Sequence, residues 1–383
     1  MAAPSALPPC LPLSPPPRAL RILANVFILF VALLAGFIVS FGQLLVTILP
    51  IDRGLKIGIC QAFANSWWSL LPFIIQVWSN IPVVWYGDKI GGGCNMITGN
   101  HRSTLDFSIG ALIASHDPEL GCGRLVPLMK DSLKYMPCVG WICYLSGALF
   151  LRRKWEEDKD KIKAKVNELV NTYPRPFWLG LYPEGTRFSE KKKLEAQEFA
   201  KKRNAEKRSD GIVLPLLECT LLPRPKGFIF FAQEEKLRKC LDNLLDFTIG
   251  EVGGNLTIGQ FLKGGFKTKS LHIHTRKIPF DDLPREKVAL EKFLYKSFER
   301  KDKRLRHLSE YSRYPPEDKP ISLAYKPSRM GLIGSFTSWA VIWIMFVASV
   351  TNWTITLSNS LILSLILFFS FRNALHAPRT PLR

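Results

Sequence analysis

The sequence is short of acidic residues and contains no CxxC cysteine pair. Asp and Glu number 32 against 52 Lys and Arg, so the formal net charge is +20. An imbalance of this size implies anionic partners: nucleic acid, anionic lipid headgroups or phosphorylated substrates. The eight cysteines are scattered, at positions 10, 60, 94, 122, 138, 143, 219 and 240. Their spacing argues against a structural metal site and favours reduced cytosolic thiols.

Several binding signatures are also missing. The glycines at 91–93 do not form a phosphate-binding fingerprint and are typical of a loop between strands. His272 and His274 would point the same way on a strand, but no third metal ligand lies nearby, so the sequence predicts no metal site. The basic residues carry no interleaved aromatic platform, which argues against nucleic acid as the partner.

Charge is absent from a long stretch near the N-terminus. Residues 1–18 are rich in proline and are expected to form a disordered tail. Residues 22–49 contain neither charge nor proline, and this length suits a membrane span of about 20 residues with tilt; the alternative is a buried core helix. Residues 57–79 are uncharged but polar in places and rich in tryptophan, which favours an interfacial or re-entrant segment. Residues 19–80 are therefore predicted to be membrane-anchoring helices.

Charge is absent again near the C-terminus. Residues 331–349 and 355–371 are uncharged, and basic residues flank the outer ends of the pair. The positive-inside rule then predicts a transmembrane hairpin over 331–372, with both outer ends in the cytosol. A linker at 311–330 would precede this hairpin, and a basic tail at 373–383 would follow it.

Residues 81–310 alternate between strand-like and helix-like patterns. The expected strands are 82–86, 95–99, 124–129, 147–152, 177–182, 213–217, 244–249 and 270–277. The expected helices are 103–115, 131–145, 155–172, 189–205, 227–239 and 283–306. Such alternation predicts an α/β domain whose mostly parallel sheet is covered by helices on both faces. Two basic stretches, 189–208 and 299–307, are expected to be solvated helix faces, the alternative being adhesion to anionic lipid.

The string NHRSTLD at 100–106 places a histidine five residues before an aspartate. On one regular helix these residues would be about 140° apart and could not meet. With His101 in the loop after strand 95–99, and Asp106 in a helix capped by Ser103, they could. His101 would then act as a general base and Asp106 would orient its imidazole, so the acceptor hydroxyl itself could be the nucleophile. The alternative is a polar helix start with a structurally bonded histidine.

The string YPEGTRF at 182–188 follows an expected strand end. Gly185, after Glu184, permits a tight turn, and Arg187 offers a fork of donors that matches phosphate oxygens. The alternative is an ordinary turn with a surface arginine. Together, the two strings indicate attack by a hydroxyl on an activated acyl group beside an anion-binding loop.

Three further strings follow the same order: KDSLKYMPCVGW at 130–141, GALFLRRKWEED at 147–158 and LLPRPKGF at 221–228. With the first two, and with LHIHTRKIPFDDLP at 271–284, the chain resembles the glycerolipid acyltransferases that acylate lysophosphatidic acid, the 1-acylglycerol-3-phosphate O-acyltransferases. RRKWEEDKDKI and TRFSEKKK are most similar to the eukaryotic endoplasmic-reticulum branch. The resemblance covers roughly residues 20–310, and Pro225 stands where this branch usually has threonine.

The resemblance implies roles for individual residues. His101 and Asp106 would be catalytic. The substrate-binding residues it implies are Lys130, Phe150, Arg153, Glu184, Gly185, Thr186, Arg187 and Pro223. Among them, Lys130 and Arg187 would hold the acceptor phosphate, Arg153 would line the same pocket with Phe150 beneath it, and Glu184 and Thr186 would shape the loop.

The resemblance also implies the reaction and its setting. Acyl-CoA would acylate the sn-2 hydroxyl of lysophosphatidic acid, without cofactor or metal, and the catalytic domain would face the cytosol from the endoplasmic-reticulum membrane. One alternative is an acyltransferase for another lysophospholipid, such as lysophosphatidylinositol. An alternative of another class is a non-catalytic, membrane-tethered protein that binds anionic lipid.

Overall fold

An eight-stranded sheet forms the centre of the computed structural model, which describes residues 16–206, 211–323 and 326–351. Its order is β4-β3-β5-β2-β6-β7-β1-β8. The strands are β1 (Val83–Gly87), β2 (Asn95–Gly99), β3 (Leu125–Lys130), β4 (Leu149–Leu151), β5 (Trp178–Leu181), β6 (Asn243–Val252), β7 (Ser270–Pro279) and β8 (Pro320–Ile321). Strands β2 to β6 run parallel to one another, β7 and β1 run the opposite way, and β8 is antiparallel to β1. The predicted, mostly parallel sheet is confirmed.

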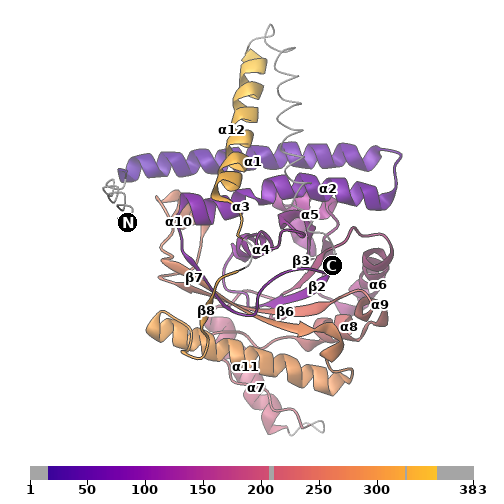
Figure 1. The fold of residues 1–383 in the computed structure, drawn as a ribbon. Helices are drawn as coiled ribbons and strands as arrows, with labels where there is room; N and C mark the ends of the chain where they lie inside the picture. The colour runs from indigo at the N-terminus through magenta and orange to yellow at the C-terminus, as the bar shows by residue number, and fades with distance from the viewer. Residues whose placement is uncertain (1–15, 207–210, 324–325, 352–383) are drawn as a thin grey trace, which may run out of the picture.

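Helices cover both faces of the sheet (Figure 1). They are α4 (Asp106–Ala114), α5 (Val139–Leu145), α6 (Trp155–Asn171), α7 (Glu190–Ala205), α8 (Pro225–Gln233), α9 (Glu235–Arg238), α10 (Ile258–Leu262) and α11 (Lys287–Tyr311). Successive residues of a strand point to opposite faces. On β6, Leu244 therefore joins the buried cluster that includes Phe298 of α11, and Leu245 joins the cluster that includes Ile109 of α4.

Proline explains two differences from the expected helices. The helix expected over 131–145 is interrupted: a 3₁₀ segment, Asp131–Tyr135, ends before Pro137, and α5 begins two residues after it. A proline inside a helix loses one hydrogen bond and clashes with the preceding turn. Pro225 instead opens α8 at its first turn, where the missing N–H has no partner to lose. The helix expected over 227–239 is also divided into two helices, α8 and α9.

A further prediction about secondary structure was wrong. Residues 213–217 form no strand, because the backbone N–H and C=O of Leu214 pair with the side chain of Asn204 and Pro215 lacks a donor. The segment 311–330 was expected to be a linker, but it contributes β8 to the sheet and buries Tyr314. The helix α10 was not predicted.

A further layer of helices lies outside α4, formed by α1 (Arg18–Ile48), α2 (Arg53–Trp68), α3 (Leu70–Pro72) and a π-helical segment (Phe73–Trp78). Helix α1 has 31 residues and is long and apolar enough to cross a membrane. In the structure it lies alongside α2, over the α/β body (Figure 1).

The inner face of α1 is bonded to the body. Asn25 donates to the carbonyl of Phe261 at 2.6 Å and accepts from Trp78 at 2.7 Å, and Gln43 donates to the carbonyl of Cys60 at 2.8 Å. The outer face is apolar. Its exposed side chains include Leu23, Phe27, Phe30, Phe37, Phe41, Leu44, Leu45 and Ile48.

Helix α12 (Arg329–Thr351) coincides with the expected apolar segment 331–349. Its first half packs on the α1–α3 layer, where Phe336 stacks on Phe73 with ring centroids 4.6 Å apart, and its second half rises away from the body (Figure 1). The second expected segment, 355–371, and the tails 1–15 and 373–383 lie outside the described residues.

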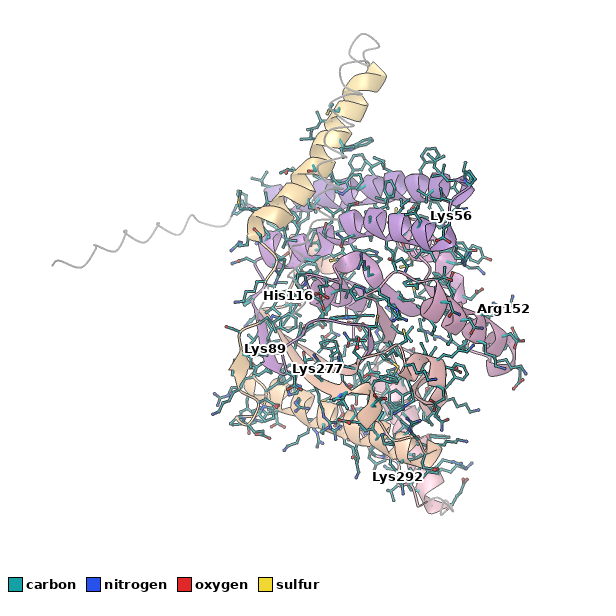
Figure 2. The ribbon with its side chains drawn as sticks, turned by 45° about the vertical axis from the view of Figure 1, so that its right-hand side comes forward. Lys56, Lys89, His116, Arg152, Lys277 and Lys292 are labelled. Carbon is teal, nitrogen blue, oxygen red and sulfur yellow. The ribbon has the colours of Figure 1, made fainter. Side chains whose placement is uncertain are left out.

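The basic helices α7 and α11 lie on the side of the molecule away from α1 and α12 (Figure 1). Lys292 of α11 is likewise at the far end from Lys56 of α2 (Figure 2). A flat membrane surface that contacts the apolar face of α1 would therefore not reach α7 or α11. Their arrangement favours the solvated-face interpretation of the two basic stretches.

Candidate active site

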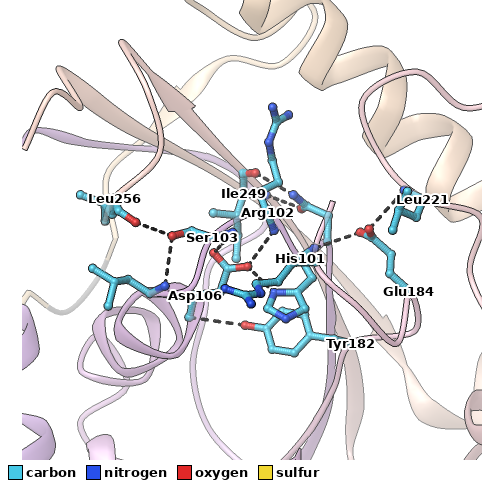
Figure 3. Close-up of polar contacts among 12 residues, drawn as sticks. His101, Arg102, Ser103, Asp106, Tyr182, Glu184, Leu221, Ile249 and Leu256 are labelled. Atoms are coloured by element: carbon cyan, nitrogen blue, oxygen red, sulfur yellow. Dashed lines mark hydrogen bonds and ion pairs between the residues drawn. The ribbon is translucent and has the colours of Figure 1, made fainter. Parts of the chain in front are cut away.

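The two main motifs meet at the carboxyl ends of β2 and β5, which are parallel neighbours in the sheet (Figure 3). Strand β2 ends at Gly99 and β5 ends at Leu181. Parallel neighbours bring the loops that follow them to one edge of the sheet, where α/β proteins place their sites. His101 and Glu184 therefore come together, although 83 residues separate them.

His101 is bonded to Asp106 as the sequence predicted. Its Nδ1 lies 2.5 Å from Asp106 Oδ2. The same oxygen accepts the N–H of Arg102 at 2.8 Å, and Oδ1 accepts the N–H of Ser103 at 3.0 Å. Asp106 is only 3% exposed. Three donors thus hold the carboxylate, and Nε2 is the ring nitrogen left to take a proton.

The expected capping role of Ser103 is not found. Helix α4 starts at Asp106, later than predicted, and has no side-chain cap. The Ser103 hydroxyl instead donates to the carbonyl of Leu256 at 2.5 Å and accepts the N–H of Leu105 at 3.0 Å. Asp106 occupies the first turn of α4, where the helix dipole stabilises a negative charge.

The ring of Tyr182 packs against the ring of His101. The two rings stack with centroids 4.8 Å apart, and the phenol donates to the backbone carbonyl of Asp106 at 3.5 Å. The pKa of the Tyr182 phenol is raised above its usual range by burial, and then by the nearby carboxyls of Asp106 and Glu184. The ring therefore stays neutral and acts as a fixed platform for His101.

Glu184 binds two loops at once. Its Oε1 accepts the backbone N–H of His101 at 2.9 Å, and its Oε2 accepts that of Leu221 at 3.1 Å (Figure 3). The side chain is 2% exposed, and burial raises its pKa to about 8. The two N–H donors act in the opposite direction and favour the carboxylate. The geometry makes Glu184 a clamp within the protein, bonded to backbone on both sides.

The turn after Glu184 requires glycine. Gly185 has φ +67°, and its N–H closes a turn onto the carbonyl of Tyr182 at 3.0 Å. The loop then returns to the histidine, because the N–H of Phe188 donates to the carbonyl of His101 at 2.8 Å. Lys192 Nζ also holds this loop, by donating to Thr186 Oγ1 at 2.5 Å and to the carbonyl of Arg187 at 3.3 Å.

An open hollow of about 300 Å³ adjoins these loops. It is lined by Arg102, Ser103, Thr104, Arg187, Phe188, Ser189, Lys192, Asn255 and Thr257. Three of these side chains are cationic and none is a carboxylate. The guanidinium of Arg102 lies 5.5 Å from the centre of the Phe188 ring. A hollow with this lining suits a phosphate group.

Sequence reasoning missed two of these cations. Arg102 stood inside the first motif, next to the histidine, but nothing in the string told where it points. Lys192 belonged to the basic stretch 189–208, which was interpreted as a solvated face. Ser189 caps α7 by accepting the N–H of Lys192, so the lysine sits in the first turn of that helix beside the loop.

Of the eight predicted binding residues, only Arg187 lines this hollow. Glu184, Gly185 and Thr186 belong to the loop beside it, and the other four lie elsewhere. Lys130 is exposed at the end of β3, and Phe150 is buried in the cluster formed with α1, α2 and α5. Arg153 has φ +66°, and its pKa is lowered by partial burial and then by Arg224. Pro223 is buried. Lys130 and Arg153 are therefore not part of the lining of the hollow that includes Arg187.

The histidine pair on β7 is bonded within the protein. His272 contacts the hydroxyls of Tyr86 at 2.8 Å and Ser270 at 3.0 Å. His274 Nε2 lies 3.2 Å from Asp318. Among the described residues, no group of three or more metal-ligating side chains occurs.

Comparisons with known proteins agree with the motifs. Residues 90–238 match the Acyltransferase family, and residues 260–336 match the family described as Acyltransferase C-terminus. The chain is 30% identical over 281 residues to 1-acyl-sn-glycerol-3-phosphate acyltransferase 3 of Arabidopsis thaliana, covering 71% of each chain. It is 29% identical over 321 residues to the human gamma form of that enzyme, covering 82% of this chain and 80% of the relative.

Among solved structures, the chain is similar to the LPA acyltransferase PlsC of Thermotoga maritima, with a TM-score of 0.41 and 15% identity over 76% of this chain and 97% of that one. The motifs and the match to the Acyltransferase family define an acyltransferase. The relatives specify which one: the chain belongs to the 1-acyl-sn-glycerol-3-phosphate acyltransferase family, as the sequence resemblance predicted.

Proposed function

We propose that this protein transfers a fatty acyl group from acyl-CoA to the sn-2 hydroxyl of 1-acyl-sn-glycerol 3-phosphate, giving phosphatidic acid and CoA. One observation carries the proposal: the His101–Asp106 pair, bonded at 2.5 Å, adjoins a hollow whose charged side chains are all cationic. The names of the relatives support the same acceptor.

The proposed reaction proceeds by general base catalysis. His101 Nε2 takes the proton of the acceptor hydroxyl as its oxygen attacks the thioester carbonyl carbon, while the Asp106 carboxylate stabilises the imidazolium. The tetrahedral intermediate then collapses, the carbon–sulfur bond breaks, and the imidazolium returns its proton to the CoA thiolate. A base in this position contributes about 10²–10⁴-fold to the rate. The scheme needs no cofactor or metal.

The acceptor phosphate would bind in the hollow beside the base. Arg187 supplies a planar fork of donors, and Arg102 and Lys192 add two further positive charges from either side of the loop. A phosphate monoester carries up to two negative charges, which three cations without a carboxylate are suited to balance. A phosphodiester such as lysophosphatidylinositol would carry only one and a bulky headgroup as well.

The experiment that tests the proposal uses the purified full-length protein, labelled acyl-CoA and a panel of lysophospholipids. We expect turnover with lysophosphatidic acid to exceed that with lysophosphatidylinositol. Preference for another headgroup would replace the proposed acceptor. Binding of anionic lipid without acyl transfer would favour the non-catalytic alternative, which gives no reason for a bonded His–Asp pair.

We also propose that the protein is held at the endoplasmic-reticulum membrane, with its catalytic domain on the cytosolic side. The support is the apolar outer face of α1 and the apolar helix α12, which rises from the same layer. Acyl-CoA is a charged cytosolic metabolite, so the site must face the cytosol. A polarity-sensitive dye on Phe41→Cys should report an apolar environment on anionic vesicles. The same dye on Phe199→Cys, on α7, should remain in water.

A further inference from the structure

Helix α11 reaches the loop that precedes the LLPRPKGF string. Asp302 Oδ1 accepts three successive backbone N–H groups, from Glu218 at 2.9 Å, Cys219 at 2.6 Å and Thr220 at 3.1 Å. Its other oxygen lies 3.3 Å from Arg306 Nε, on the same helix. Asp302 is 1% exposed. A buried carboxylate that accepts three N–H groups fixes the loop 218–220 in one conformation.

The next residue of that loop contacts the site. Leu221 donates its N–H to Glu184 Oε2, and Glu184 Oε1 accepts the N–H of His101. Two buried carboxylates thus connect α11 to the backbone of the catalytic histidine, with residues 218–221 between them. Asp302 itself has no bond to His101, Asp106 or the residues of the hollow.

We infer that Asp302 is a positioning residue for acyl transfer: by holding the loop 218–220, it keeps the Leu221 N–H on Glu184, and so keeps Glu184 as the carboxylate that holds His101. This inference rests on the proposed function, since it assigns a role within that reaction. No motif of the sequence and no expected site residue pointed to α11.

The opposing contributions to the pKa of Glu184 explain why the hydrogen bond from the Leu221 N–H matters. Burial raises the pKa of Glu184, while the N–H groups of His101 and Leu221 lower it. The charged groups that act on it are Asp106, which raises the pKa, and Arg102, which lowers it. If the Leu221 N–H moves away, the carboxyl keeps its proton to a higher pH. A protonated Glu184 can no longer accept at both oxygens, and the His101 backbone loses part of its support.

The direction in which the pH profile should move follows from the raised pKa of Glu184. The folded pKa of Glu184 is already raised, so the carboxylate form is gained as pH rises. Loss of one N–H donor moves that gain to still higher pH. A residue that merely stabilised the fold would lower the amount of active protein at every pH and leave the position of the acid limb unchanged.

The test is Asp302→Asn in the full-length protein, with kcat and KM measured from pH 6 to 9. Asparagine keeps the size but removes the charge that holds three donors. We expect kcat to fall on the order of 10- to 100-fold, as for other small displacements of a catalytic group. The KM values for both substrates should stay within about twofold, and the acid limb of kcat should move up by about one pH unit.

Glu291→Gln is the matched control. It makes the same carboxylate-to-amide change at a buried position of α11, where Glu291 accepts from Tyr295. It should leave the acid limb in place. A normal acid limb in Asp302→Asn, or an equal shift in Glu291→Gln, overturns the inference.

A second variant covers the case in which Asp302→Asn does not fold. Asp302→Glu keeps the buried charge but, being longer, cannot place one oxygen on all three N–H groups, so we expect a smaller shift in the same direction. A folded Asp302→Glu protein with the kcat and acid limb of wild type contradicts the role. Failure of the proposed function is recognised separately, because wild type would then not acylate lysophosphatidic acid at any pH.

Discussion

His101 Nδ1 lies 2.5 Å from Asp106 Oδ2, a distance that two residues five apart on one helix could not achieve. They reach it because the chain leaves β2 at Gly99 and starts α4 only at Asp106. The aspartate stands at the helix start while the histidine is still in the loop. The bond fixes which nitrogen of the imidazole carries the proton, and this decides what the other nitrogen can do.

Replacing His101 should therefore remove catalysis without unfolding the protein. We expect His101→Ala to lose turnover to background, and Asp106→Asn to lose on the order of 10³–10⁴-fold in kcat by misorienting the imidazole. Labelled acyl-CoA turnover and thermal unfolding measure the two properties. His307→Ala, at a half-buried histidine of α11, is the control and should behave as wild type. Turnover at the wild-type rate in His101→Ala would remove the residue from the mechanism.

Arg187 can be tested through the acceptor. Lysine keeps the charge but loses the planar fork, so Arg187→Lys should weaken the use of lysophosphatidic acid by about 1.5–3 kcal/mol, the range for hydrogen bonds to charged groups. Part of this loss should appear in KM if the contact is equal in ground and transition states. Monoacylglycerol, which lacks the phosphate, should be a poor acceptor and be little affected by the change. Equal losses with both acceptors would mean that Arg187 supports the loop or binds CoA.

Lys192 should act on the same acceptor, although no pattern in the sequence singled it out. Lys192→Ala removes one cation from the hollow and also the bond to Thr186. We expect KM for lysophosphatidic acid to rise roughly tenfold, the loss of one charge-assisted hydrogen bond. Lys193→Ala is the matched control, because the neighbouring lysine pairs with Glu190 and Glu218 outside the hollow. Similar KM values for the two variants would count against a phosphate in this hollow.

Glu184 should make stability depend on pH in an unusual direction. Its pKa is about 8 in the folded protein against 4.5 for an ordinary glutamate, so the folded state binds an extra proton between these values. The free energy of unfolding contributed by this group is therefore full below pH 4.5 and decreases as pH rises to 8. Glu184→Gln removes the titration, and chemical denaturation across this range should show a flatter pH dependence than wild type. An unchanged slope would show that the carboxyl is not protonated in the fold.

The sequence predicted the bonded His101–Asp106 pair because both members belong to one short string at a strand-to-helix junction. The sheet was predicted for a similar reason, since alternating patterns report burial locally. What could not be predicted depends on tertiary contact. Lys192 is oriented by its bond to Thr186, and Asp302 acts across 82 residues of chain on the N–H of Thr220. No periodicity reveals such partners.

The differences between the predicted and the observed secondary structure have local causes. The strand expected at 213–217 has the right apolar pattern, but the side chain of Asn204 satisfies Leu214 in place of a neighbouring strand. The helix expected over 131–145 contains Pro137, which interrupts it. In both cases, a single residue outweighed a favourable pattern. Asn204 supplies the hydrogen bonds that a neighbouring strand would have made, and Pro137 lacks the N–H that a helix needs.

The flat position of α1 has a consequence for the shape of the bilayer that the protein would prefer. Its inner face is tied to the body through Asn25 and Gln43, so only the apolar outer face can enter lipid. In the proposed placement, a helix of 31 residues then adds its width to one leaflet and nothing to the other. Such a wedge fits best where the outer leaflet is already stretched, as on strongly curved membranes. The enzyme would thus bind small vesicles more tightly than flat bilayers of the same composition.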